Sequence, residues 1–464
     1  MSREGQLLEL LVPLERGHGP LHAQVERRLR DSIRAGQLVP GIALPSTRAL
    51  ARSLGVSRGV VFEAYGQLAA EGYLVARQGA ATRVASRAAT AAPRARPTRF
   101  PDMAGAHDLM PGRPDLSAFP RDLWLGSTRR VLRRAPDAVL GYPDPRGTVE
   151  LREALSAYLG RARAVLPDPH NTVVTAGVTQ GVVLLSQVLR EQGHVRLAVE
   201  DPGFHLHRWS IARAGLEPAP VRVDSDGLDV EMLAATGARA VLVTPAHQMP
   251  TGVVLSPTRR VDLLAWADEV DGLVIEDDYD AEYRFDREPI GALQGVNPER
   301  VAYAGSASKT LANALRLGWL VLPERLARPV AWERVAVDGG GPVLEQLAFA
   351  DLLARGEIDR HLRRTRRLYR RRRDALVSAL AEHVPSAELV GAAAGLHALV
   401  LLPESVDEER LSGSLRSSGV ACQELRELRT APGPPGLVLG YAHLTEPALR
   451  RAVVALGEAV RQVV

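Results

Sequence analysis

The sequence predicts a multidomain protein in which a small N-terminal α+β domain precedes a large α/β domain. Short helical patterns rich in arginine fill the first fifth of the 464 residues. An Ala, Pro and Arg-rich stretch follows, and beyond it short apolar runs alternate with helical patterns, as in strand–helix–strand units of a mostly parallel sheet. The expected boundaries are 14–84 for the first domain, 85–107 for a linker and 108–464 for the second domain. Within the second domain, we expect a large part at about 140–325 and a smaller C-terminal α+β part at about 340–464.

The overall composition is that of an ordinary globular protein, with 46% apolar and 24% charged residues. Cys422 is the only cysteine, which excludes an intrachain disulfide and a cysteine-based metal site, and no metal site is predicted. No apolar run is long enough to span a membrane, and the first residues lack the apolar core of a signal peptide. The expected location is therefore the cytoplasm.

Positive charge is concentrated near the N-terminus. Residues 1–85 contain eleven Arg against seven Asp and Glu, and residues 86–100 contain four Arg and no acidic residue. The rest of the chain has 43 basic and 47 acidic residues, although the net charge of the whole is +4. This distribution indicates a nucleic-acid partner for the N-terminal domain.

Three short helices are predicted before residue 72. Apolar residues recur every four positions over 21–33, Ser46 is a suitable N-cap for a helix that stops at Gly55, and a third helix runs from about Ser57 to Ala70. The last two resemble a helix-turn-helix, and residues 72–84 read as two strands around a turn. In such a unit Arg48 would hold the DNA backbone, and Ser57 and Arg58 would enter the major groove. A purely structural three-helix cap is the alternative interpretation.

Lys309 is the only lysine among 58 basic residues. Lysine can lose its proton when desolvated and condense with an aldehyde to a Schiff base, whereas arginine cannot. The residue therefore indicates carbonyl chemistry. Alternatively, Lys309 is an ordinary lysine that remains in a composition that has drifted toward arginine. The neighbouring residues must decide between these two interpretations.

Polar segments follow four of the predicted strands, which end near residues 200, 244, 276 and 304. The carboxyl ends of parallel strands meet at one edge of the sheet, so these segments should converge on one crevice. Asp277 and Tyr279 are two apart in an extended segment and face the same way, which suits a pyridine nitrogen and a ring oxygen. The remaining candidates would bind a phosphate or stack on a ring: Ser306, Ser308, Arg316, Val178, Thr179 and Phe204. Aldehyde, pyridine, hydroxyl and phosphate together describe pyridoxal 5′-phosphate, although each residue alone has an ordinary structural explanation.

The N-terminal domain resembles the GntR-type winged helix-turn-helix. The resemblance rests on the segments 20–24, 38–41, 44–51, 54–58 and 64–74. It implies that Arg48, Ser57, Arg58 and the wing residue Gly79 contact an operator in double-stranded DNA.

The second domain resembles fold-type I aminotransferases, which are pyridoxal phosphate-dependent α/β proteins. Residues 306–309 match the lysine motif, and Asp277, Tyr279, Val178 and Thr179 match cofactor-binding positions. Tyr142 matches a tyrosine that reaches the cofactor phosphate of a neighbouring subunit. The whole chain resembles the MocR-type subfamily of GntR regulators. This resemblance implies a transcription factor that senses pyridoxal phosphate or an amine or amino-acid effector, and a head-to-tail homodimer in which the DNA-binding domains are swapped.

Two departures from working aminotransferases favour sensing over turnover. Val438 stands where an arginine grips the substrate carboxylate, unless Arg426 or Arg429 substitutes for it. Met249 stands where an asparagine bonds the cofactor ring oxygen, unless a shift brings in His247 or Gln248. A true aminotransferase with an added DNA-binding domain and an empty dimerisation scaffold are the rival hypotheses. The nine arginines of 360–373 are interpreted as a solvated helix face between the two parts of the second domain.

Overall fold

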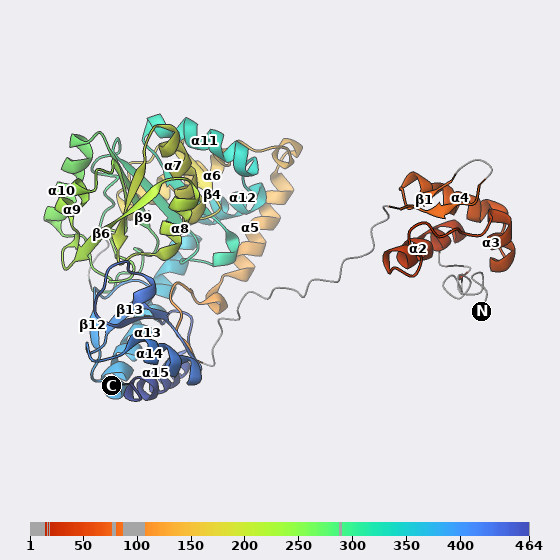
Figure 1. The fold of residues 1–464 in the computed structure, drawn as a ribbon. Helices are drawn as coiled ribbons and strands as arrows, with labels where there is room; N and C mark the ends of the chain where they lie inside the picture. The colour runs from red at the N-terminus through yellow and green to blue at the C-terminus, as the bar shows by residue number, and fades with distance from the viewer. Residues whose placement is uncertain are drawn as a thin grey trace. The chain divides into compact units, whose positions relative to one another are not determined.

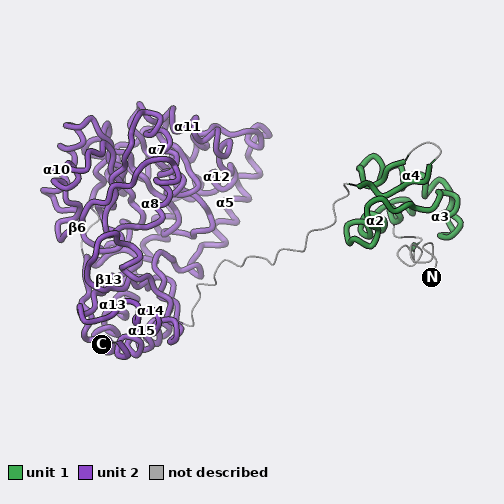
Figure 2. The backbone as a smooth tube through the Cα atoms, viewed as in Figure 1, with its two compact units in different colours: residues 1–102 green, residues 103–464 purple. Residues whose placement is uncertain are grey.

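The computed structural model describes residues 14–15, 17, 19–76, 80–86, 107–286 and 290–463. The chain divides into two compact units, residues 1–102 and residues 103–464 (Figure 2). Gly79 and nearly all of the predicted linker lie outside the described residues.

The first unit contains the predicted helix-turn-helix. Helices α2 (Leu21–Arg34) and α3 (Thr47–Leu54) both pack against α4 (Arg58–Ala70), and β1 (Leu74–Val75) pairs antiparallel with β2 (Arg83–Val84). The Ser46 side chain accepts the hydrogen bond of the Ala49 amide, and Gly55 ends α3 in the left-handed conformation, as predicted. The core of this unit consists of apolar residues from all three helices and both strands, including Val25, Leu29, Leu50, Val61, Leu68 and Val84.

The second unit is built on an eight-stranded sheet of order β4-β11-β10-β9-β8-β5-β6-β7 (Figure 1). Strands β10, β9, β8, β5 and β6 are parallel, whereas β11 runs antiparallel to both of its neighbours. The mostly parallel sheet expected from the sequence is therefore confirmed. The strands are β4 (Thr172–Thr175), β5 (Arg196–Asp201), β6 (Glu217–Asp224), β7 (Gly227–Leu228), β8 (Ala240–Val243), β9 (Leu273–Asp278), β10 (Val301–Ser306) and β11 (Gly318–Val321).

Helices cover both faces of this sheet. Apolar residues of α7 and α11 share one buried cluster with the sheet, and those of α9 and α10 contribute to another. Both faces of the central strands are consequently buried, which explains their continuous apolar runs. The helices of this part are α5 (Arg121–Arg134), α6 (Val149–Arg163), α7 (Val178–Glu191), α8 (His205–Arg213), α9 (Val230–Ala235), α10 (Pro257–Glu269), α11 (Glu324–Asp338) and α12 (Val343–Ala354).

The C-terminal part packs its helices on a second, four-stranded antiparallel sheet of order β12-β13-β16-β15 (Figure 1). A short parallel pair joins β14 to β3, which precedes the large sheet in the chain. No helix within the described ranges is both long and apolar enough to cross a lipid bilayer. The elements of this part are β3 (His107–Asp108), α13 (Glu357–His383), β12 (Glu388–Val390), β13 (His397–Leu401), α14 (Glu408–Ser417), β14 (Val420–Ala421), β15 (Gln423–Glu424), β16 (Gly436–Gly440) and α15 (Glu446–Arg461).

Candidate functional site

A cavity of about 470 Å³ lies beyond the carboxyl ends of β5, β8, β9 and β10. The sequence predicted this place, because polar segments follow these strands. Tyr142 and His247 do not line the cavity. Nine of the residues proposed from the sequence do line it: Val178, Thr179, Phe204, Asp277, Tyr279, Ser306, Ser308, Lys309 and Arg316.

Lys309 follows β10 and reaches across the cavity. Its Nζ donates a hydrogen bond of 2.8 Å to the carbonyl of Gly112, which has a positive φ of 77°. Burial lowers the pKa of Lys309, although the nearby Asp280 and Asp277 carboxylates oppose this effect. A lowered pKa makes the neutral, nucleophilic amine more accessible at neutral pH. Lys309 is therefore a buried amine at the cavity whose surroundings favour the neutral form.

Asp277 lies within β9 and presents a carboxyl group that lacks a full set of partners. The side chain is buried, and its Oδ1 has no hydrogen-bond partner among the described residues. Burial, followed by repulsion from Asp278, raises the pKa of Asp277 to about 8. A buried carboxyl in this state is suited to a ligand that brings a positively charged N–H group, such as a protonated pyridine.

His207 is a neighbour of this carboxyl that the sequence analysis missed. Its Nε2 lies 3.7 Å from Asp277 Oδ2, and burial lowers the pKa of His207 to about 4, so the ring is neutral at neutral pH. A usable signal was present in the sequence. His207 follows the predicted stacking residue Phe204 by three positions, and residues spaced by three or four on a helix share a face.

The start of α7 and the Arg316 guanidinium group form one end of the cavity, which we call the anion cradle. Gly177 precedes α7 with a φ of 101°, so the free N–H groups of the first turn of the helix are available to an anion. A Cβ at Gly177 would lie 3.1 Å from Arg316 Nη2, which is tighter than an ordinary contact, and the positive φ also favours glycine here. A helix N-terminus beside a guanidinium group favours a phosphate.

The Tyr279 hydroxyl contacts a buried polar pair, His247 and Asp280. The Tyr279 hydroxyl lies 3.0 Å from His247 Nδ1, and this nitrogen lies 3.1 Å from Asp280 Oδ1. His247, proposed from the sequence as a direct partner of a ring oxygen, contacts Tyr279 instead of lining the cavity. Met249, at the position where an amide was expected, does line it.

In the first unit, the residues proposed to contact DNA lie around the beginning of α4. Ser57 is the N-cap residue of α4, and its hydroxyl makes no capping hydrogen bond. Arg58 Nε lies 3.5 Å from Thr47 Oγ1 at the start of α3, and Arg48 is exposed beside it. The N-terminal end of α4 therefore presents a hydroxyl and a guanidinium group, and Arg48 at the start of α3 adds a second guanidinium group.

Comparisons with known proteins agree with both halves of this description. The family described as "Bacterial regulatory proteins, gntR family" matches residues 21–84, and "Aminotransferase class I and II" matches residues 121–456. The probable rhizopine catabolism regulatory protein MocR of Rhizobium meliloti is 32% identical over 467 residues, which cover 95% of this chain and 94% of that protein. The chain belongs to the MocR-type GntR regulators.

A second relative and a solved structure extend the comparison. The HTH-type pyridoxine biosynthesis transcriptional regulator PdxR of Corynebacterium glutamicum is 32% identical over 94% of this chain and 95% of its own length. The crystal structure of an archaeal alanine:glyoxylate aminotransferase matches with a TM-score of 0.71 and 26% identity, covering 76% of this chain and 90% of that one. This MocR-type chain is thus a DNA-binding transcriptional regulator, and its aminotransferase class I and II domain implies pyridoxal phosphate as the cofactor.

The expected carboxylate-binding position of this regulator is apolar. Val438 is fully buried on β16 and packs with Leu399, Leu425 and Leu428, and Met249 packs against the same cluster. The two departures noted in the sequence therefore belong to one apolar cluster, of which Met249 lines the cavity and Val438 does not.

The arginines considered as substitutes for the missing one are engaged elsewhere. Arg426 Nε pairs with Glu424 at 2.9 Å, and Arg429 pairs with Glu408 at 2.8 Å. Neither lines the cavity, whereas Arg113 and Arg208, which the sequence analysis missed, do line it. Arg113 pairs with Asp108.

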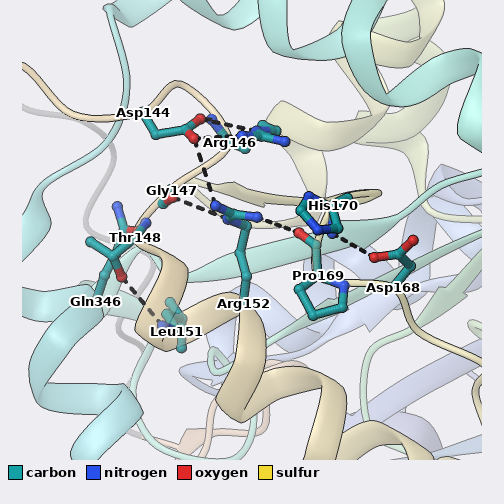
Figure 3. A network of polar contacts seen from close by, with 10 residues as sticks. All are labelled: Asp144, Arg146, Gly147, Thr148, Leu151, Arg152, Asp168, Pro169, His170 and Gln346. Carbon is teal, nitrogen blue, oxygen red and sulfur yellow. Dashed lines mark hydrogen bonds and ion pairs between the residues drawn. The ribbon is translucent and has the colours of Figure 1, made fainter.

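Tyr142 is fully exposed, and the segment that follows it is held by a network of polar contacts (Figure 3). Asp144 pairs with Arg146 at 2.8 Å and lies 3.6 Å from the buried Arg152. Arg152 also donates hydrogen bonds to the carbonyls of Gly147 and Pro169. The segment after Tyr142 is therefore fixed to α6 and to the chain before β4, whereas the Tyr142 side chain is exposed.

The raised pKa of Asp277 predicts a pH dependence of the cofactor-free protein. Because its pKa of about 8 lies above the value of an unfolded aspartate, the stability that Asp277 contributes is complete at low pH and is lost as pH rises toward about 8. Buried histidines with a lowered pKa oppose this trend only below about pH 6.5, the pKa of a histidine in the unfolded chain. We expect the free energy of unfolding to fall between about pH 6.5 and 8, by at most about 1.4 kcal/mol per pH unit from this group.

Urea unfolding across this interval provides the measurement, with Asp277→Asn as the comparison. The free energy of unfolding of the variant should fall less steeply with pH. Part of the decline should remain, because burial also raises the pKa of Glu200 to about 7. Identical slopes for the two proteins would contradict the assignment of a protonated carboxyl to Asp277.

Proposed function

We propose that this regulator holds pyridoxal phosphate through Lys309 and changes its binding to an operator when the cofactor, or an amine or amino-acid effector that reacts with it, is present. The single observation that carries the proposal is the grouping of a nucleophilic lysine, a buried unpaired carboxyl and an anion cradle around one cavity. The relative PdxR, named as a regulator of pyridoxine biosynthesis, supports a ligand of this class. The regulator acts on DNA in the cytoplasm.

Each residue has a separate part in holding the cofactor. The Lys309 amine would hold the aldehyde group by a covalent bond. Asp277 would accept a hydrogen bond from the protonated ring nitrogen, and its neighbour His207 would keep that carboxyl oriented. Tyr279, fixed by His247, would contact the ring oxygen, and Phe204 would stack on the ring. Arg316 and the start of α7 would hold the phosphate, together with Val178, Thr179, Ser306 and Ser308. When bound, pyridoxal phosphate supplies an aldehyde that exchanges amines and a ring that accepts electrons.

The apolar cluster at Val438 favours sensing over sustained turnover. In working aminotransferases, the arginine at the matching position grips the substrate carboxylate by two charge-assisted hydrogen bonds. Its absence removes about 1.5–3 kcal/mol per lost charged bond from the binding of an ordinary amino acid. Sustained transamination between an amino donor and a keto acid would contradict this part of the proposal and support the rival function of an aminotransferase.

The chain forms a head-to-tail homodimer in this proposal. Tyr142 is fully exposed on a loop that Arg152 and Asp144 fix in place, which suits a residue that reaches the cofactor phosphate of a neighbouring subunit. Sedimentation as a particle of one 50.0 kDa chain would contradict this arrangement.

A gel-shift assay on the DNA upstream of its own gene tests the regulatory function. We expect binding to change on addition of pyridoxal phosphate, and Arg58→Ala to weaken specific binding by about 1–3 kcal/mol, because an arginine at the start of the recognition helix reads base edges. Arg27→Ala on the exposed side of α2 is the matched control and should bind like the parent protein. Equal losses in the two variants, or no response to the cofactor, would contradict the proposal.

A further inference from the structure

A second cavity, of about 390 Å³, lies between the end of α6, the segment after β9 and the first half of α13. It shares no lining residue with the cofactor cavity. Its walls come from both parts of the second unit, because α6 belongs to the part with the large sheet and α13 leads into the C-terminal part. The lining residues are Tyr158, Arg161, Ala162, Arg163, Glu282, Asp359, Leu362, Arg363 and Arg366.

The charges that line this cavity are unbalanced toward the positive. Four of its nine residues are arginines, and its carboxyl groups are those of Asp359 and Glu282. Asp359 pairs with Arg161 at 2.7 Å. The Glu282 carboxyl accepts a hydrogen bond from the Tyr158 hydroxyl, and burial followed by repulsion from Asp278 raises the pKa of Glu282 to about 7. Glu282 therefore carries only part of a negative charge near neutral pH.

The other three arginines of the cavity have N–H groups that are available to a ligand. Arg163 is buried, and its Nε donates to Asp278 at 2.7 Å, but neither terminal nitrogen has a hydrogen-bond partner among the described residues. Arg366 donates to the backbone carbonyl of Glu282 at 2.9 Å. Within the described part of the chain, neither Arg363 nor Arg366 has a carboxylate within ion-pair distance. A planar guanidinium group with free N–H donors is suited to a phosphate or carboxylate.

We propose that this second cavity binds a small oxyanion, with phosphate and carboxylate groups as the shared ligand chemistry. The site explains part of the arginine-rich helix, which the sequence analysis interpreted as a solvated face. The exposed Arg363 and the half-buried Arg366 face the cavity from α13, opposite Arg161 and Arg163 of α6. An oxyanion between them offsets the repulsion of the four guanidinium groups and joins the two helices.

The bound anion lies close to two elements of the cofactor site. Asp278, the partner of Arg163, is the residue after Asp277 on β9. On α13, His361 Nε2 lies 2.9 Å from the carbonyl of Thr310, the residue after Lys309. An oxyanion that fixes α13 against α6 therefore stabilises the positions of the two segments that carry Lys309 and Asp277.

The test measures anion binding to the full chain loaded with pyridoxal phosphate, so that the cofactor already fills its own phosphate position. Inorganic phosphate and malonate are titrated separately by calorimetry and by thermal unfolding, each against sodium chloride at equal ionic strength. We expect saturable binding and a rise in the unfolding temperature with at least one of the two anions, since a ligand bound only by the folded state stabilises it. The anion that binds more tightly identifies the group that the site prefers.

Variants of α13 locate the site. Arg363→Gln and Arg366→Gln should each weaken binding about tenfold, as expected for loss of a charged hydrogen bond. Arg370→Gln, an exposed arginine of the same helix outside the cavity, is the matched control and should bind like the parent. Responses to both anions no larger than that to sodium chloride would overturn the proposal. Unchanged binding in both Arg363→Gln and Arg366→Gln would also overturn it.

Discussion

Lys309→Ala is expected to abolish covalent attachment of pyridoxal phosphate. Lys309 is the only lysine of the chain, so no second lysine can form the bond if this one is removed. The rest of the cavity remains, and Asp277 and Arg316 can still hold the cofactor reversibly. We therefore expect a protein that takes up colour when mixed with the cofactor but loses it on dialysis. The measurement is the visible spectrum after dialysis, together with the intact mass after borohydride reduction.

Lys309→Arg separates the chemistry of the amine from its charge. Arginine keeps a positive side chain in the cavity but cannot condense with an aldehyde, so this variant should also lose the covalent bond. Far-UV circular dichroism of both variants should match that of the parent. A mass increase by one reduced cofactor in either variant would show that another group carries the attachment, and the role of Lys309 would have to be abandoned.

Much of the fold follows from local features of the sequence. The Ser46 cap and the Gly55 stop determine α3 within the sequence itself, without tertiary contacts. The central strands are recognisable because burial on both faces requires continuous apolar runs. Strand β6 was missed, because Pro218 and Pro220 argue against a strand. The structure accommodates them since β7 pairs only with Val223 and Asp224, so the first part of β6 has no second neighbour.

The site was predictable where its residues follow the ends of parallel strands or are related by sequence spacing. Asp277 and Tyr279 were assigned together because alternate residues of a strand face the same side. In contrast, the spacing from Phe204 could place His207 on the side of the site, but its approach to Asp277 depends on the tertiary fold. The pairing of buried Arg163 with Asp278 joins residues 115 positions apart and likewise depends on the tertiary fold.

Val438→Arg, which restores the arginine of working aminotransferases, is expected to destabilise the protein by about 3–5 kcal/mol and to confer no sustained transamination. Val438 is fully buried, and β16 is paired on both sides at this residue, opposite Leu399 on β13 and Gln423 on β15. The side chains packed around it are apolar, so a guanidinium placed there would lose its hydration without gaining a partner. Urea unfolding, followed by far-UV circular dichroism and by the cofactor absorbance, measures the change.

Val438→Met is the matched control, because it adds length without charge. It should lower the free energy of unfolding by about 1–3 kcal/mol, which is less than the effect of Val438→Arg. A stable Val438→Arg protein that transaminates an amino acid would show that the added side chain escapes the cluster and reaches the cavity. In that case Val438 alone, and not the surrounding apolar cluster, would limit turnover. A Val438→Arg protein that is destabilised more than Val438→Met would instead show that the cluster of Val438, Leu399, Leu425, Leu428 and Met249 does not admit a charge. Recovery of an aminotransferase would then require changing the cluster as a unit, because a charge at Val438 needs an opened path to the cavity and a ligand to pair with.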